Sequence, residues 1–113
     1  MKKGFLFTAL LVLASIASFA QVKWSADPAH SSIIFGVKHL GLSFVQGHFN
    51  KFDGSIETAD STNFNNAKVD FTVDVASIST GVDQRDNHLK SDDFFNAAEY
   101  PNMTLKSVSF KKV

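Results

Sequence analysis

The stretch that decides the fold is Lys68–Val75, "KVDFTVDV", in which polar and apolar side chains alternate without interruption. Its odd-numbered positions are Val or Phe, and its even-numbered positions are Lys, Asp or Thr. Because successive side chains of a strand point to opposite faces, this pattern is typical of an antiparallel sheet with one wet face. The apolar face has to be covered, so the stretch predicts a sheet folded over an apolar interior.

The segments before it repeat the pattern. Residues 31–39, "SSIIFGVKH", place Ile and Phe at alternate positions, and residues 42–57, "LSFVQGHFNKFDGSIE", are long enough for two strands in succession. Within that run we expect Gly47 to form a bulge or sharp bend, and Asp53-Gly54 to form a turn.

The segment after Pro101, "MTLKSVSFKKV", also alternates, but its apolar phase changes between Leu105 and Val108. A phase change of this kind predicts a bulge near residues 106–107. With this segment the chain contains about five antiparallel strands, the profile of an all-β barrel or sandwich.

Helix is expected only around residues 83–97, which contain the charged run "RDNHLKSDDFF". Asp83 is a candidate cap for a turn that runs through Leu89, and Ser91 or Asp92 for a second short one. The segment then resembles a lid with a polar back and an apolar underside that carries Phe94 and Phe95. We therefore predict one short helical insertion in the β domain.

Composition narrows the classes of function. The chain has 113 residues, no Cys, a formal net charge of zero, and 12 Phe against one Trp and one Tyr. Phe supplies apolar volume without a hydrogen-bonding group, so this composition suits an apolar interior or channel. The absence of a basic excess argues against nucleic acid as a partner.

Residues 1–20 have the pattern of a secretory signal peptide, with Lys2-Lys3, a long apolar run and small residues at Ser18 and Ala20. We expect cleavage before Gln21, a domain spanning residues 21–113, and no stable membrane insertion after cleavage. A retained membrane anchor is the alternative for this run.

The sequence contains few residues in patterns that are typical of catalytic sites. The chain has no Cys and no Gly-x-Ser-x-Gly elbow, so we predict no catalytic residue and no cofactor. His39, His48 and His88 are the right donor types for a metal, although none of them has the close spacing of a compact site. We predict no metal site, and a metal-dependent enzyme that uses these three histidines remains an alternative.

Two long stretches carry a family resemblance. Residues 24–56, "WSADPAHSSIIFGVKHLGLSFVQGHFNKFDGSI", and residues 74–105, "DVASISTGVDQRDNHLKSDDFFNAAEYPNMTL", resemble the YceI family of exported, lipocalin-like proteins. The motifs that carry it occur in family order with family-like spacing: Val37-Lys38-His39, Ser79-Thr80-Gly81, Asp93-Phe94-Phe95 and Tyr100-Pro101.

The resemblance implies an eight-stranded antiparallel β-barrel around a long apolar channel that holds a polyisoprenoid or similar amphiphilic lipid. It also implies a periplasmic carrier or store that is not an enzyme. Family members continue with further strands, so we expect this chain to be an N-terminal fragment whose barrel is incomplete at the C-terminus. A homodimer is left open.

The resemblance also suggests where a ligand would lie. The apolar residues expected to line the channel are Phe35, Val37, Phe44, Phe49, Phe71, Val73, Phe94, Phe95 and Leu105. The residues expected to make polar contacts near a mouth are His39, Arg85 and His88. Ordinary core packing is the alternative role for the first set, and tying of loops for the second. An envelope stress protein that binds nothing is a further alternative for the whole chain.

Overall fold

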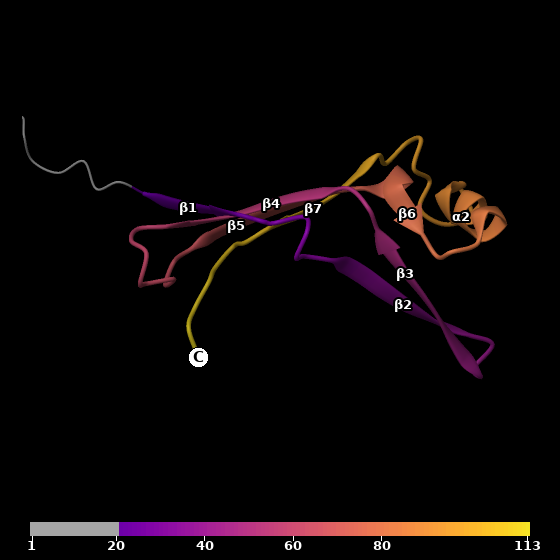
Figure 1. Cartoon of the computed structure of the whole chain (residues 1–113), viewed down its shortest axis with the longest axis horizontal. Helices are drawn as coiled ribbons and strands as arrows, with labels where there is room; N and C mark the ends of the chain where they lie inside the picture. The colour runs from indigo at the N-terminus through magenta and orange to yellow at the C-terminus, as the bar shows by residue number, and fades with distance from the viewer. Residues whose placement is uncertain (1–20) are drawn as a thin grey trace, which may run out of the picture.

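The structure is a computed structural model that describes residues 21–113, and these form two antiparallel sheets and one short α-helix (Figure 1). The expected signal peptide, residues 1–20, lies outside the described residues. The elements in chain order are β1 (Val22–Ser25), β2 (Ile33–His39), β3 (Ser43–Phe49), β4 (Phe52–Thr58), β5 (Lys68–Asp74), the 3-10 helix η1 (Val75–Ser77), β6 (Ile78–Ser79), α2 (Asp83–Lys90) and β7 (Asn102–Lys106). The prediction of an all-β domain with one helical insertion is confirmed.

The two sheets are joined by chain segments that run from one into the other: β3 continues into β4, and β5 continues into β6. One sheet has the order β1-β4-β5-β7 and the other β2-β3-β6. The chain passes from β3 to β4 through Asn50 and Lys51, and from β5 to β6 through η1. Figure 1 shows the β2–β3 hairpin turning away from the four-stranded sheet at this corner. The described residues therefore form a bent, open sheet that does not close into a barrel.

The corner arises where one strand has more residues than its neighbour. Phe49 pairs with Ile78 and Phe52 with Val73, so the two residues between the pairs on one strand face four on the other. Such an excess bends a sheet and leaves backbone groups without ladder partners. Ser77 restores these partners, because its hydroxyl donates to the Asp74 carbonyl at 2.6 Å and accepts from the Lys51 amide at 3.0 Å.

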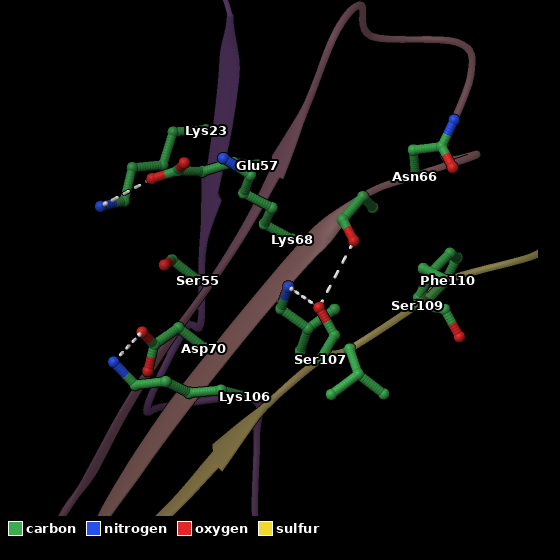
Figure 2. A pocket seen from close by; sticks show the side chains of 13 residues that line it. Lys23, Ser55, Glu57, Asn66, Lys68, Asp70, Lys106, Ser107, Ser109 and Phe110 are labelled. Atoms are coloured by element: carbon green, nitrogen blue, oxygen red, sulfur yellow. Dashed lines mark hydrogen bonds and ion pairs between the residues drawn. The ribbon is translucent and has the colours of Figure 1, made fainter.

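The four-stranded sheet has one polar and one apolar face. Figure 2 shows the polar face, where the Lys23 ammonium lies 3.6 Å from Glu57 and the Lys106 ammonium 3.3 Å from Asp70. The opposite positions of the paired strands are apolar and include Trp24, Ile56, Val69, Phe71, Met103 and Leu105. The division of faces predicted from residues 68–75 is therefore confirmed.

The buried core sits at the corner between the sheets. Phe49, Val73 and Ile78 are buried there. The partly buried residues around them come from both sheets and from the helical segment: Ile33, Phe35, Phe52, Leu89, Phe95 and Met103. The apolar faces of the two sheets thus meet at the core and form one concave surface.

Gly47 and Gly54 have a different role from the one predicted. Gly47 lies inside β3 opposite Phe35, and Gly54 lies inside β4 opposite Phe71. A Cβ on either glycine would overlap the ring of the phenylalanine opposite. The predictions of a bulge at Gly47 and a turn at Asp53-Gly54 are therefore wrong, because each glycine makes room for a cross-strand aromatic ring.

The helical insertion also differs in detail. Val82 occupies the N-cap position of α2 without a side-chain hydrogen bond, and Asp83 lies in the first turn. The second predicted helical turn is a set of hydrogen-bonded turns, in which the amides of Phe94 and Asn96 donate to the Ser91 carbonyl at 3.1 and 2.8 Å.

No bulge forms near residues 106–107. β7 ends at Lys106, and the amide of Val69 donates to the side-chain oxygen of Ser107 at 2.9 Å instead of to a ladder carbonyl. Val108 is consequently left fully exposed.

Candidate functional site

The candidate site is an apolar pocket of about 590 Å³ between the β2–β3 hairpin and the helical segment. Figure 1 shows α2 and this hairpin at the same end of the molecule. The strands supply Phe35, Val37, His39 and Val45, and the helical segment supplies Arg85, His88, Leu89, Phe94 and Phe95. A mostly apolar lining with a few polar groups is typical of sites that bind small apolar or amphiphilic molecules.

The strand wall follows from the alternation of β2 and its register with β3. Phe35, Val37 and His39 are alternate residues of β2, so their side chains share a face, and Val45 pairs with Val37. The ring of Phe35 packs against those of Phe49 and Phe95, with centroids 5.6 and 6.4 Å apart. This wall is therefore anchored in the core at its inner end.

The helical wall is held by the turn that follows α2. The amide of Phe95 donates to the Leu89 carbonyl at 3.0 Å, which folds the chain back beneath the helix. The Phe95 ring then meets Phe49 edge-on, with centroids 5.8 Å apart. Leu89 and Phe95 consequently close the inner end of the pocket, while Phe94 stays exposed beside it.

Arg85 is fixed by Thr80 in the loop after β6. Its Nε donates to the Thr80 hydroxyl at 2.7 Å, and a terminal nitrogen donates to the Thr80 carbonyl at 2.9 Å. Thr80 also binds Asp86, whose carboxylate accepts from the Thr80 hydroxyl at 2.6 Å and from the Thr80 amide at 2.8 Å. Two hydrogen bonds to Thr80 therefore hold the guanidinium at the pocket wall.

Asp86 is buried, with 8% of its surface exposed, and its pKa lies below the usual value. The main cause is the hydrogen bond from the Thr80 hydroxyl, which outweighs the opposing effect of burial. The Thr80 amide and the charges of Arg85 and Lys90 lower this pKa further. The Thr80–Asp86 contact thus connects the loop after β6 to α2 with an ionised carboxylate.

His88 connects α2 to the next turn. Its Nε2 lies 3.0 Å from a carboxylate oxygen of Asp93, and its ring meets Phe94 edge-on with centroids 4.9 Å apart. His39 faces the same pocket from the strand side, at the end of β2. The three predicted polar contacts, His39, Arg85 and His88, therefore line one pocket.

The other predicted residues divide into three groups. Phe35, Val37, Phe94 and Phe95 line the pocket. Phe49 and Val73 lie in the core, and Phe71 and Leu105 lie on the apolar face of the four-stranded sheet. Phe44 pairs with Lys38 and lies on the opposite face of β3, so the structure does not bring it to the others.

Two lining residues were missed. Val45 shares the face of Phe35 and Val37, and Leu89 faces the pocket from α2. Strand parity counted from Phe49 identifies Val45, because residues 45, 47 and 49 share one face of a regular strand.

A second apolar hollow, of about 350 Å³, lies on the other side of the core. Its lining comes from β1, the start of β2, β4 and β5 and includes Trp24, Ile33, Phe52, Ile56 and Phe71. The concave surface thus carries apolar hollows on both sides of the corner, an arrangement that suits an elongated apolar molecule better than a compact one.

The geometry does not favour the metal alternative. His48 pairs with Ile34 and lies on the face of β3 opposite to the pocket that His39 and His88 line. Within residues 21–113, no three His, Cys, Asp or Glu side chains gather closely enough to hold a metal ion. The same residues include no helix that is long and apolar enough to cross a membrane.

Known sequences match nearly the whole chain. The YceI-like domain family matches residues 24–113. Protein YceI of Escherichia coli is 39% identical over 109 residues, which are 96% of this chain and 56% of that protein. A UPF0312 protein of Pectobacterium carotovorum is 39% identical over 107 residues, 93% of this chain and 55% of that protein. The chain therefore spans about half the length of these relatives.

Solved structures agree with the fold. BcnA of Burkholderia cenocepacia superposes with a TM-score of 0.65 at 26% identity, over 74% of this chain and 51% of that one. The YCEI protein of Campylobacter jejuni superposes with a TM-score of 0.59 at 38% identity, over 80% of this chain and 52% of that one. The antiparallel architecture of this chain is thus shared with these lipocalin-like proteins.

Proposed function

The chain belongs to the YceI-like domain family, and from this premise we propose that it forms part of a lipocalin-like binding protein for a polyisoprenoid or similar long-chain amphiphilic lipid. The observation that carries the proposal is the apolar pocket of about 590 Å³ on a concave surface that continues past the core to a second apolar hollow. Storage or transport of the lipid is the expected role.

Binding would be driven by burial of the lipid chain. Each methylene removed from water contributes about 0.8 kcal/mol, so a dozen buried units contribute about 10 kcal/mol. That is comparable to the free energy lost when two molecules associate. Apolar walls discriminate weakly between chains, so the polar groups of His39, Arg85 and His88 would contact the headgroup and add selectivity.

The proposed protein acts by binding and not by catalysis, and it needs no cofactor or metal. We place it in the periplasm, because residues 1–20 have the composition of a cleaved signal peptide. The lipid would be its only ligand, and a homodimer is the one protein assembly that we keep open.

Lipid extraction tests the proposal directly. The complete gene product is purified without detergent from its native envelope fraction, extracted with organic solvent and examined by mass spectrometry. We expect one long-chain amphiphile in near-stoichiometric amount. Protein that is folded but carries no lipid, and takes none up from a dispersed polyisoprenoid, would favour the envelope protein that binds nothing.

A further inference from the structure

The β2–β3 hairpin ends in an exposed apolar tip. Leu40, Leu42 and Phe44 have 81, 90 and 70% of their surfaces exposed. They lie on and beside the turn that joins the strands, in which the Leu42 amide donates to the His39 carbonyl at 3.1 Å. Three large apolar side chains in five residues are unusual at a loop tip, where polar residues normally lie.

The backbone of this turn is strained by its own sequence. Leu40 has a φ of +51° and Gly41 a φ of +71°, as a type I′ turn requires at both central positions. Asn is the usual first residue of such a turn, because its side chain tolerates positive φ, whereas Leu has no compensating hydrogen bond. A strained and exposed Leu is expected where the side chain itself has a use.

The charged side chains in the sequence of the hairpin have one sign. No Asp or Glu occurs between Pro28 and Phe52, and this segment contains Lys38, Lys51 and three histidines. Lys38 lies directly across from Phe44, next to the tip. An apolar end with cationic side chains behind it is the chemistry that recognises an anionic lipid surface.

The tip is also continuous with the candidate pocket. Val37 and His39 on one strand and Val45 on the other line that pocket and follow the tip directly along the hairpin. At a rise of about 3.3 Å per residue, Val45 lies roughly 10 Å from Leu42. A bilayer that receives the tip would therefore lie close to the pocket.

We propose that Leu40, Leu42 and Phe44 dock the protein reversibly on an anionic lipid surface, where the amphiphile passes between the bilayer and the pocket. The inference rests on the proposed function and names the place where the ligand is exchanged. The docked hairpin inserts only its apolar side chains into the interface, so the protein remains peripheral.

Vesicle flotation tests the docking. The complete gene product is floated with vesicles of phosphatidylethanolamine and phosphatidylglycerol, and with vesicles of phosphatidylcholine alone. We expect binding to the anionic vesicles and at least about tenfold weaker binding for the variant Leu40→Asn/Leu42→Ser. The matched control is Ile34→Ser, which removes an Ile that is 76% exposed on the same hairpin but away from the tip. It should bind as the wild type does.

Leu40→Asn also separates docking from folding. Asn relaxes the turn, so the double variant should unfold at the same or a higher temperature while it loses vesicle binding. Equal flotation of wild type, double variant and control would overturn the proposal. So would a concentration-dependent dimer that the double variant abolishes in the absence of vesicles, because the tip would then bind a second copy.

A second readout distinguishes failure of the docking from failure of the proposed function. The double variant should take up a dispersed polyisoprenoid to the same level as wild type, and acquire it from vesicles about tenfold more slowly. If neither protein takes up dispersed lipid, the proposed function is wrong. If both take it up and both acquire it from vesicles at one rate, only the docking is wrong.

Discussion

Gly47 and Gly54 act in this fold through the side chain that they lack. Each lies opposite a phenylalanine on the neighbouring strand, Phe35 or Phe71, and each ring occupies the space where a Cβ would be. The two pairs lie in different sheets, on the apolar face in both cases. A side chain at either glycine would therefore have to displace a ring from the apolar face.

Alanine at Gly47 tests this role. The new methyl group must displace the Phe35 ring, so we expect the free energy of unfolding to fall by about 1–3 kcal/mol, the usual range for an overpacked core. Urea unfolding measures the change. Gly36→Ala in β2 is the matched control, because no atom lies within 4 Å of its added Cβ. An equal effect of the two substitutions would contradict the account.

Asp86 predicts a pH dependence of stability. The pKa of Asp86 in the folded state lies below the ordinary value of 3.8. The contribution of its carboxylate to the free energy of unfolding is therefore complete above pH 3.8, and it is lost as the pH falls through the folded-state pKa. Thr80→Val removes the hydroxyl that is the main cause of this shift. The stability difference between wild type and Thr80→Val should therefore be larger at about pH 7 than at about pH 3. Thermal unfolding at both pH values measures it, and a constant difference would rule out the ionised contact.

The elements themselves were largely predictable from alternation. β5 follows the pattern of residues 68–75, and the long run of residues 42–57 forms β3 and β4 in succession. What the pattern could not supply was the register. A bulge at Gly47 would have turned Phe44 to the face of Phe49, whereas the regular strand puts Val45 there. A shift of one residue in the register thus places Phe44, which was predicted to line the channel, on the opposite face.

The helical segment was predicted for its position and less well for its ends. Its charged residues suggested caps, but Val82 occupies the N-cap of α2 without a side-chain hydrogen bond, and the second helical turn is absent. Sequence patterns describe propensities, and here hydrogen bonds between Thr80, Arg85 and Asp86 place the helix instead. These are contacts between the loop after β6 and α2, which the pattern of caps and apolar residues does not reveal.

Phe94 and Phe95 should separate binding from stability. Phe95 packs on Phe35 and Phe49, so Phe95→Ala should lower the free energy of unfolding by about 3 kcal/mol. Phe94 is 58% exposed and lies at the pocket beside His88, so Phe94→Ala should change stability by less than about 0.5 kcal/mol and still weaken lipid uptake. Chemical denaturation and lipid uptake on the same samples test both statements. A Phe94→Ala protein with wild-type uptake would remove Phe94 from the site.

Residues 21–113 form a bent sheet whose apolar faces meet at the core, and the opposite face of its four-stranded part is polar. The sequence predicted the two faces, since alternation alone fixes them, but it did not predict the corner. The corner depends on the excess residues between Val73 and Ile78 and on the hydroxyl of Ser77, which can be recognised only when the partner strand is known. The corner matters for function, because it divides the concave surface into two hollows around the core.

The central claim is that the concave pocket holds a long-chain amphiphile. The most direct test is the equilibrium affinity of a fluorescent polyisoprenoid analogue for two variants that differ by one position in β3. Val45→Trp fills the pocket, whereas Phe44→Trp puts the same side chain on the opposite face. We predict that Val45→Trp weakens binding at least about tenfold and that Phe44→Trp binds as the wild type does. Equal affinities for the two folded variants would contradict the account.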